Sequence, residues 1–287
     1  MAEEQFGFVK GKGTTDAIIA LRNIIEKSNA RQDQELWLLF IDYSKAFDTV
    51  VHKKLWKAFI NLGVPKHLVW LLQKLYQKAK GVMRVEQEKT EPFKFEKGVR
   101  QGCLVSPIAF IMVGEVIMRI TEEKCGNLRR GYNAGGRDIW NIRYADDTTL
   151  IARSREDLER MAEELRRASL EFGLKINNAK TNVMNIGGKG KIRIERDEIE
   201  DVQKVKFLGS MVTAEGDCLT EIKRRLAIAK DNTIKLNSIW KAGELTLELK
   251  KTLAKSLIWS TALYACESWT IKKEAENKIN AFEMWLW

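Results

Sequence analysis

Residues 139–152 read IWNIRYADDTTLIA, and the expected fold is built around them. Two short runs of apolar and β-branched residues, 139–144 and 148–152, flank the tripeptide Ala145-Asp146-Asp147. Runs of this kind on either side of a short polar break predict the two strands of a β-hairpin. Two carboxylates are therefore expected at the tip of a hairpin.

A third acid follows another apolar run. Residues 36–41 read LWLLFI, which predicts a strand buried on both faces, and the run ends at Asp42. Carboxylates beside a buried sheet are costly unless they are solvated, paired or bound to metal. Three converging acids would repel one another, and oxygen ligands without His or Cys favour magnesium or manganese. The residues alone leave a second interpretation open, in which Asp146-Asp147 only supplies turn chemistry.

Helices are expected between and around these strands. A glycine-rich, basic stretch precedes a predicted helix that ends near Asn29, with Thr14 or Thr15 as N-cap, and it lacks the spacing of a phosphate-binding loop. Helical patterns cover 51–61 and 66–78, separated by Gly63-Val64-Pro65. A helix to about Glu123 is predicted with Ser106 as N-cap and Pro107 as its first residue. The pattern of residues 154–173 predicts another, with a capping box of Ser154 and Asp157 and a terminal Gly173.

The remaining pattern predicts short strands and a helical end. GVMRVEQ and FKFEKGV alternate on either side of a polar EKTEP turn at 88–92, which predicts a hairpin. Further strands are expected around 182–186, 192–194 and 205–212, and helices after Gly216. The order of elements predicts an α+β core with a helical appendage, with a boundary near 207–216.

Composition limits the class of protein. The 287 residues are 45% hydrophobic and 31% charged, as in a globular protein, and the net charge of +10 favours a polyanionic partner. No apolar run is long enough for a membrane span, and the first residues lack a signal-peptide layout. A nuclear or cytoplasmic location is expected, without a membrane. Neither zinc nor a disulfide is expected, because the cysteines and histidines are dispersed; these are Cys103, Cys125, Cys218, Cys266, His52 and His67.

Five motifs occur in an order typical of one enzyme family: FIDYSKAFDTV at 40–50, GVRQGCLVSP at 98–107, YADD at 144–147, GLKINNAKT at 173–181 and KFLG at 206–209. Over roughly residues 5–213 the chain resembles reverse transcriptases, in particular those of non-LTR retrotransposons of the LINE type. LYACESWTI at 263–271 and AFEMW at 281–285 resemble the segment that follows the palm in such enzymes. Group II intron maturases and telomerases share the palm, but the LINE-like C-terminal segment disfavours them.

This resemblance implies a fold and a reaction. The fold would be a right-hand polymerase palm, a ferredoxin-like antiparallel sheet with helices, followed by a helical thumb-like part. Residues 1–35 would be a remnant of the fingers or a connecting segment, 36–205 the palm, and 206–287 the primer grip and thumb-like region. The reaction would be RNA-directed DNA synthesis with two Mg²⁺ ions, for which Mn²⁺ substitutes. The expected partners are an RNA template, a DNA primer or nicked target DNA, and dNTPs.

The resemblance also implies roles for single residues. Asp42, Asp146, Asp147 and the carbonyl of Tyr43 would hold the metal ions. Phe47 would be the ring that excludes a 2′-hydroxyl, and Lys180 the acid that protonates pyrophosphate. Arg100, Gln101 and Gly102 would contact the nucleotide or the template. The primer grip would consist of Phe207, Leu208 and Gly209. A purely structural role stays open for two of these residues, with Phe47 as a core residue and Lys180 as a solvated lysine in a turn.

Departures from the family pattern favour a piece of a larger reading frame, truncated at both ends. Leu104-Val105 stand where the family has Pro-Leu, and Val9 and Lys12 where arginines are frequent. Fingers motifs and an endonuclease are not recognised, and the chain stops in a Trp-rich helix with Trp285 and Trp287. The alternative function is therefore a catalytically inactive remnant that binds nucleic acid, and a third is an inert pseudogene product.

Overall fold

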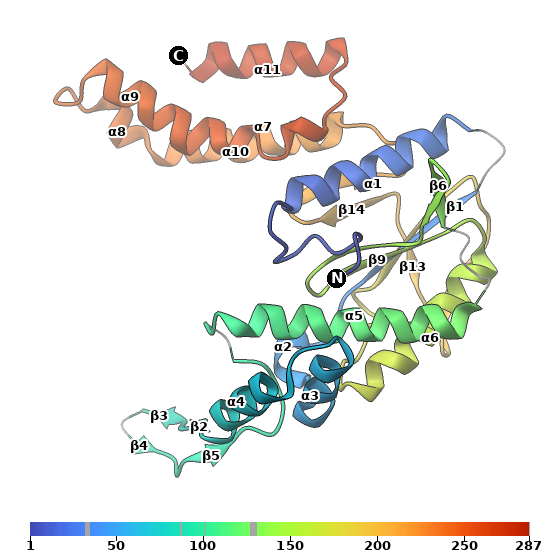
Figure 1. The fold of residues 1–287 in the computed structure, drawn as a ribbon. Coiled ribbons are helices and arrows are strands. Elements are labelled where there is room, and N and C mark those ends of the chain that lie inside the picture. The colour runs from blue at the N-terminus through green and yellow to red at the C-terminus, as the bar shows by residue number, and fades with distance from the viewer. Residues whose placement is uncertain (32–34, 87, 101, 127–130, 287) are drawn as a thin grey trace. The chain divides into compact units, whose positions relative to one another are not determined.

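Two compact units make up the chain. The computed structural model describes residues 1–31, 35–86, 88–100, 102–126 and 131–286 (Figure 1). Unit 1 consists of Met1–Gly13 and Gln34–Asp201, and unit 2 of Thr14–Asp33 and Val202–Trp287. The N-terminal helix therefore groups with the C-terminal segment.

The centre of unit 1 is a five-stranded sheet. Its order is β13-β10-β1-β9-β8, with β1 Leu36–Ile41, β8 Asn141–Tyr144, β9 Asp147–Ala152, β10 Asn182–Ile186 and β13 Glu200–Asp201. The central strand β1 is antiparallel to both β9 and β10, and all six of its residues are buried, as its apolar run predicts. Only the short edge strand β13 runs parallel to its neighbour.

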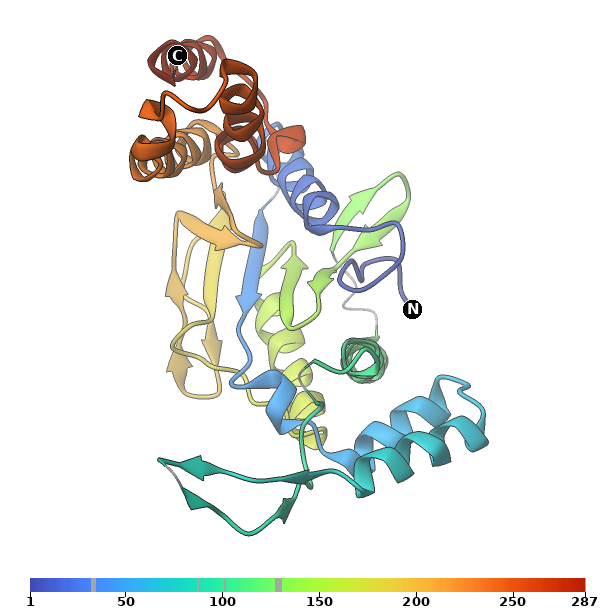
Figure 2. The ribbon, with the colours of Figure 1, turned by 90° about the vertical axis from the view of Figure 1, so that its left-hand side faces the viewer.

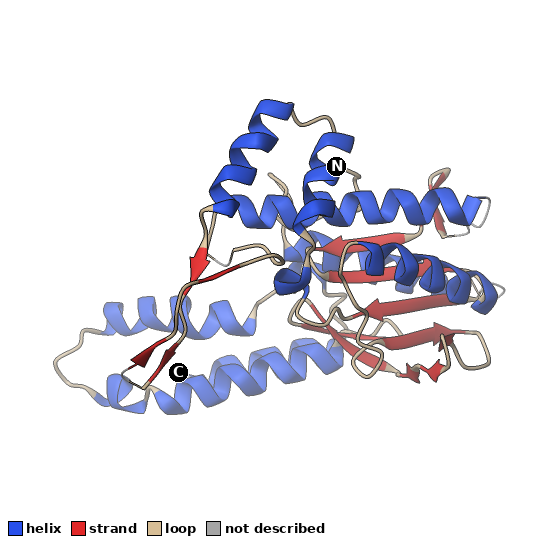
Figure 3. Cartoon of the chain, turned by 90° about the horizontal axis from the view of Figure 1, so that it is seen from below, coloured by secondary structure: helices blue, strands red, loops and turns tan. Residues whose placement is uncertain are grey.

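Two long helices, α5 (Val105–Cys125) and α6 (Arg155–Glu171), lie on one face of this sheet (Figures 1 and 3). The predicted capping of α6 is confirmed, because the Ser154 hydroxyl accepts from the Asp157 amide at 3.2 Å. Gly173 follows this helix with a φ of +89°, a conformation that favours glycine. The predicted cap of α5 is wrong. This helix begins at Val105, and the Ser106 side chain is buried with its hydroxyl 3.5 Å from that of Tyr76.

Three helices and a narrow ribbon extend unit 1. The helices are α2 (Ala46–Thr49), α3 (His52–Asn61) and α4 (Lys66–Gln77), and the ribbon pairs β2 (Lys80–Gly81) with β5 (Phe93–Lys94) and β3 (Arg84–Val85) with β4 (Glu88–Lys89). The hairpin is confirmed, but its turn was placed wrongly at EKTEP. Val85 pairs with Glu88, and the Thr90 amide donates to the Met83 carbonyl at 2.9 Å. Glu86 takes a positive φ of 55°, so the chain turns there.

Two small hairpins complete unit 1: β6 (Tyr132–Ala134) with β7 (Arg137–Ile139), and β11 (Arg193–Ile194) with β12 (Asp197–Glu198). The expected single strand over 139–144 is therefore divided at Trp140. Ile139 pairs with Tyr132 in the small hairpin, whereas β8 begins at Asn141 and pairs with β9.

Unit 2 combines a helix, a hairpin and a helical bundle. The bounds are α1 Thr14–Asn29, β14 Lys204–Phe207, β15 Ser210–Thr213, α7 Leu219–Lys235, α8 Asn237–Lys241, α9 Leu247–Leu253, the π-helix η2 Ala254–Trp259, α10 Ser260–Ala262, the 3₁₀ helix η3 Cys266–Ser268 and α11 Lys273–Leu286. The predicted helices after Gly216 are confirmed, and Figure 2 draws them in orange to red. Thr14 and Thr15 lie inside the first turn of α1, so neither is the predicted cap. The expected strand over 205–212 is two strands with a turn at Leu208-Gly209.

Each unit has hydrophobic clusters of its own. In unit 1 the buried faces of β1 and β9 pack with α5 and α6, through residues that include Leu39, Leu150, Phe110 and Leu165. In unit 2 a smaller cluster joins α7, η2, α10 and α11 through Ala229, Ile258, Ala262 and Phe282. Among the described residues, no helix combines the length and the apolar character needed to cross a lipid bilayer.

Candidate active site

The tip of the β8–β9 hairpin presents the two adjacent aspartates. Tyr144 pairs with Asp147, so the connecting turn is Ala145-Asp146, and Asp147 is the first residue of β9. Ala145 has a positive φ of 57°, which a tight two-residue hairpin turn requires. The predicted hairpin with acids at its tip is confirmed, with Asp147 in the strand rather than in the turn.

A segment near the N-terminus braces this turn. The Phe6 amide donates to the Arg143 carbonyl at 2.8 Å, and the Arg143 amide donates to the Glu4 carbonyl at 2.9 Å. The next residue, Gly7, is buried so closely against the turn that a Cβ atom there would lie 2.6 Å from the Ala145 nitrogen. Sequence reasoning treated this stretch as an ordinary loop. Its signal was the glycine in QFGF, which marks a close backbone approach.

Replacing Gly7 with alanine is therefore expected to displace the Ala145-Asp146 turn. Overpacking of this kind costs about 1–3 kcal/mol, and the Ala145 backbone has no flexible end that can yield. The free energy of unfolding in urea should fall by this amount. Gly243→Ala is the matched control, because its Cβ would meet nothing within 4 Å. Equal free energies of unfolding for the two variants would contradict the close packing of Gly7 against the Ala145-Asp146 turn.

Asp42 is held by residues of the GLKINNAKT motif. Its carbonyl accepts from the Asn177 amide at 2.8 Å, and its carboxylate accepts from the Asn177 side chain at 3.2 Å. The buried Thr181 hydroxyl donates to the Asn177 carbonyl at 2.9 Å and accepts from the Asp42 amide at 3.4 Å. Sequence reasoning missed Asn177 and Thr181. Both residues lie in the GLKINNAKT motif, in which a role was expected only for Lys180.

The three acids influence one another electrostatically. Burial raises the pKa of Asp146, and the charge of Asp42 adds to this effect. Burial, followed by the charges of Asp146 and Asp42, raises the pKa of Asp147 to about 6. Asp147 keeps an exposed surface, so solvent screens part of this repulsion. The structure thus gathers negative charge at the adjacent ends of β1, β8 and β9.

The donor chemistry at this place fits a hard divalent cation, because carboxylate oxygens are the ligands that magnesium prefers. Mutual repulsion of the acids is also the condition that a cation relieves. As the side chains stand, no three Asp, Glu, His or Cys residues in the described part of the chain lie close enough to enclose an ion. The Asn177 side chain holds the Asp42 carboxylate in this arrangement.

Tyr43 and Phe47 follow Asp42 directly. The Tyr43 hydroxyl is 3.0 Å from that of Ser169, and burial raises the pKa of Tyr43 to about 12. The Tyr43 side chain therefore packs inside the protein. The predicted metal ligand is its backbone carbonyl, which this packing does not involve. The Phe47 ring stacks on that of Phe110, with centroids 4.4 Å apart and planes 14° apart. This packing holds the ring rigidly and is compatible with both interpretations of Phe47.

The other residues with a predicted role at the nucleotide are Arg100, Gln101, Gly102 and Lys180, and the structure does not join those of them that it describes in one cluster with the three aspartates. Arg100 lies over the Tyr76 ring at 5.8 Å, and Gly102 is exposed with a φ of +81°. Gln101 lies outside the described residues. Lys180 is exposed in a turn, where its amide donates to the Asn177 carbonyl at 3.0 Å. The structure thus places Lys180 beside the residue that orients Asp42.

Residues 1–212 match the protein family described as reverse transcriptase (RNA-dependent DNA polymerase). The chain belongs to this family. The reverse transcriptase chain is 26% identical over 194 residues to the Pol polyprotein of the type-1 retrotransposable element R2 of Nasonia vitripennis, covering 67% of this chain and 18% of that protein. It is 26% identical over 230 residues to the R2DM Pol polyprotein of Drosophila melanogaster, covering 74% of this chain and 21% of that protein. The resemblance to non-LTR retrotransposon enzymes is confirmed, and the chain spans about a fifth of the length of these relatives.

Telomerases are among the solved structures with a similar fold. Telomerase from Candida albicans, in complex with a fragment of telomeric RNA, matches with a TM-score of 0.56 and 12% identity, over 95% of this chain and 50% of that one. Apo telomerase from Candida tropicalis, truncated from its C-terminal domain, matches with a TM-score of 0.54 and 15% identity, over 74% and 40%. The predicted palm and thumb fold of the reverse transcriptase chain is confirmed.

The residues predicted as the primer grip lie in unit 2, at the β14–β15 turn. Phe207 is buried, whereas Leu208 and Gly209 form the turn with φ values of +46° and +80°. The Tyr264 hydroxyl donates to the Leu208 carbonyl at 2.9 Å, and an Arg224 nitrogen donates to the Gly209 carbonyl at 2.6 Å.

Arg225 also donates to the Gly209 carbonyl and lies 4.2 Å from the Tyr264 ring centroid. Both arginines bond to the fully buried Glu221, which accepts from the Met211 amide as well. The sequence pattern alone gives no sign of this role for Arg224 and Arg225. Their role in the reverse transcriptase fold is to fix the shape of this turn.

Proposed function

We propose that this chain is an RNA-directed DNA polymerase core that transfers a nucleotidyl group from a dNTP to a primer 3′-hydroxyl. The observation that carries the proposal is the gathering of Asp42, Asp146 and Asp147 at the ends of three neighbouring strands, with the pKa values of Asp146 and Asp147 raised. A functional site is where such perturbed carboxylates are expected.

In this proposal Asp42, Asp146, Asp147 and the Tyr43 carbonyl hold two Mg²⁺ ions, for which Mn²⁺ substitutes. Ions of this kind polarise phosphoryl oxygens and lower the pKa of a bound hydroxyl. Asn177 keeps the Asp42 carboxylate in place, and the N-terminal brace fixes the turn that carries Asp146. The carboxylates repel one another without a cation, so they are poised to bind one.

The other predicted residues act on substrate in the same proposal. Phe47, stacked on Phe110, excludes a 2′-hydroxyl by its rigid ring. Arg100, Gln101 and Gly102 contact the incoming nucleotide or the template, and Lys180 protonates the leaving pyrophosphate. Leu208 and Gly209 set the primer terminus, on a turn whose carbonyls are fixed by Tyr264 and Arg224.

The partners in this proposal are an RNA template and a DNA primer or nicked target DNA. The net charge of +10 supports a polyanionic partner, and the telomerase of similar fold from Candida albicans was solved with RNA. The family match over residues 1–212 supports the RNA-directed reaction.

Primer extension tests the proposal. Purified protein is incubated with an RNA template, an annealed DNA primer, dNTPs and Mg²⁺ or Mn²⁺, and the primer should lengthen only when template and metal are both present. Cooperative unfolding in urea would show that the purified chain is folded. If such a chain extended no primer at any concentration of Mg²⁺ or Mn²⁺, the proposal would be overturned. Salt-dependent RNA binding by such a chain would support the inactive, nucleic-acid-binding alternative.

A further inference from the structure

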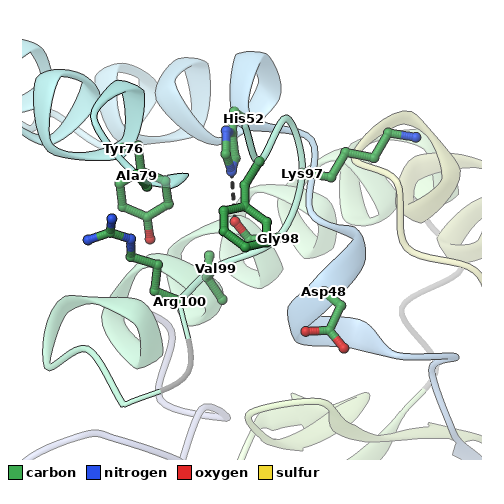
Figure 4. Close-up of a pocket in the computed structure, with 9 residues that line it drawn as sticks. Asp48, His52, Tyr76, Ala79, Lys97, Gly98, Val99 and Arg100 are labelled. Atoms are coloured by element: carbon green, nitrogen blue, oxygen red, sulfur yellow. Dashed lines mark hydrogen bonds between the residues drawn. The ribbon is translucent and has the colours of Figure 1, made fainter. Parts of the chain in front are cut away.

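The His52 side chain connects two segments of unit 1 that are far apart in sequence. His52 is the first residue of α3, and its ring lines a hollow of about 480 Å³ (Figure 4). Its Nε2 atom lies 2.8 Å from the Gly98 carbonyl oxygen, as the dashed line in Figure 4 marks. Because a carbonyl oxygen only accepts, Nε2 is the donor of this hydrogen bond. His52 thus holds the beginning of the segment that leads to Arg100.

The His52 ring sits on a rigid support. It meets the buried Tyr76 ring edge-on, with centroids 5.1 Å apart and planes at 87°. The Trp56 ring follows one turn later on α3, with its centroid 6.1 Å away. The helix itself is anchored in the hydrophobic core by Leu55 and Phe59. A donor on such an element holds its acceptor more precisely than a donor on a loop does.

The acceptor segment lies directly against α2. The Gly98 amide donates to the Val50 carbonyl at 2.8 Å, and the Val99 amide donates to the Phe47 carbonyl at 2.7 Å. Gly98 has a φ of +87°, and a Cβ atom on it would lie 2.9 Å from the Asp48 carbonyl oxygen. The Phe47 backbone is therefore bonded to a segment whose conformation and close approach require glycine.

Two parts of the proposed nucleotide site meet at these backbone bonds. On one side is Phe47, whose ring stacks on that of Phe110 with centroids 4.4 Å apart. On the other side, two residues after Gly98, is Arg100, whose guanidinium lies 5.8 Å from the Tyr76 ring centroid. The position of the Gly98 backbone therefore affects the residue that is predicted to select the sugar.

The His52 hydrogen bond differs from the backbone bonds in what it joins. The backbone bonds tie Gly98 and Val99 to residues 47–50, so they hold the two segments to each other. The His52 bond ties the Gly98 carbonyl to α3, which is anchored in the core. It therefore limits the movement of Gly98 relative to the core of unit 1.

We propose that His52 is a positioning residue for sugar selection, which acts through Gly98 on the backbone that carries Phe47. This role rests on the proposed function, in which the Phe47 ring excludes a 2′-hydroxyl. Without the His52 donor, the Gly98 segment is held less firmly to α3, and the Phe47 backbone bonded to it is less constrained. A less constrained ring excludes a hydroxyl less strictly, because steric repulsion depends steeply on distance.

Two variants of His52 isolate the hydrogen bond. His52→Leu removes the donor and keeps a branched apolar side chain, whereas His52→Gln keeps a nitrogen donor at the same number of bonds from the backbone. Both variants lose the ring contacts with Tyr76 and Trp56. An effect that both variants share therefore comes from packing, and an effect of His52→Leu alone comes from the hydrogen bond.

Sugar selection is measured as kcat/KM for a deoxyribonucleotide divided by kcat/KM for the matching ribonucleotide. His52→Leu should lower this ratio about fivefold, the effect of losing one hydrogen bond of about 1 kcal/mol. His52→Gln should keep the ratio within about twofold of wild type, because the donor is retained. His67→Leu replaces an exposed histidine on α4 and is the matched control, which should leave the ratio unchanged.

Hydrogen exchange in EDTA gives a readout that needs neither metal nor nucleotide. The Gly98 and Val99 amides donate to the segment that carries Phe47, so they should exchange about fivefold faster in His52→Leu than in wild type. In His52→Gln they should exchange at the wild-type rate. Amides of the central strand β1 are the internal control, because only a global loss of stability would accelerate them as well.

Wild-type sugar selection in His52→Leu, by an enzyme that extends primers, would overturn the proposal. An equal loss of selection in His52→Leu and His52→Gln would overturn it too, because packing of the ring would then be responsible. A wild-type chain that extends no primer would refute the proposed function. Unchanged exchange of the Gly98 and Val99 amides in His52→Leu would refute the positioning role of His52 whatever the activity of the chain.

Discussion

Replacing Asp146 and Asp147 together with asparagine is expected to reduce primer extension by on the order of 1000-fold or more. The variant keeps the shape of the β8–β9 turn but removes two of the three carboxylates, and metal ions supply several kcal/mol of stabilisation to a phosphoryl-transfer transition state. The measurement is the single-turnover rate on an RNA template at saturating Mg²⁺. Extension at more than a tenth of the wild-type rate would refute the role of these acids.

The stability of the same variant separates lost chemistry from misfolding. In the folded chain the pKa of Asp147 is raised from 3.8 to about 6, so its charged form is disfavoured relative to the unfolded chain. The destabilisation appears as the pH rises from about 4 and is complete above 6. In EDTA at pH 7 the variant should therefore be more stable than wild type, by about 1 kcal/mol after allowance for solvent screening, with no gain below pH 4. Urea unfolding at both pH values checks this; a less stable variant at pH 7 would contradict it.

Phe47→Val is expected to increase the incorporation of ribonucleotides relative to deoxyribonucleotides by about tenfold or more. In the proposed site the stack on Phe110 fixes the ring, so that it would not rotate away from a 2′-hydroxyl, and a steric clash of this kind costs about 1–3 kcal/mol. Valine shortens the side chain while it preserves an apolar contact. The measurement is kcat/KM for each nucleotide at one template position.

A core residue of the same type is the control for Phe47. Phe59 is buried in the same hydrophobic core but carries no predicted role at the nucleotide. Phe59→Leu should lower stability and leave sugar selectivity unchanged. If Phe47→Val behaves in the same way, the interpretation of Phe47 as a core residue is correct and the gate is absent.

Periodicity and motifs predict the elements of the active site well but not how those elements are fixed. LWLLFI and the flanks of YADD are strands because their apolar runs are long enough to be buried on both faces. Asn177 and Gly7 act through contacts that lie far away in sequence, which no local pattern encodes. The same reason explains the misplaced turn of the ribbon and the wrong cap at Ser106, whose hydroxyl meets Tyr76 instead of a helix amide.

The sequence pattern also does not predict that α1 belongs to the same unit as residues 202–287. The pattern of α1 predicts an amphipathic helix, but nothing in it tells which part of the chain covers its apolar face. The sequence around Arg224 and Arg225 likewise gives no sign that both arginines bind one buried glutamate and the carbonyl of a turn. Such pairings depend on tertiary contacts and become visible only in the structure.

The grouping of α1 with the C-terminal segment has a consequence for synthesis on the ribosome. Arg22 in α1 donates to the Met211 carbonyl at 2.7 Å, and this partner is translated 189 residues later. Until then the apolar side of the helix, with Ile18, Leu21 and Ile25, lacks the hairpin it will join. A nascent chain of this protein therefore exposes this apolar face until residues 204–213 have been synthesised, and exposed apolar surface of this kind favours aggregation during folding.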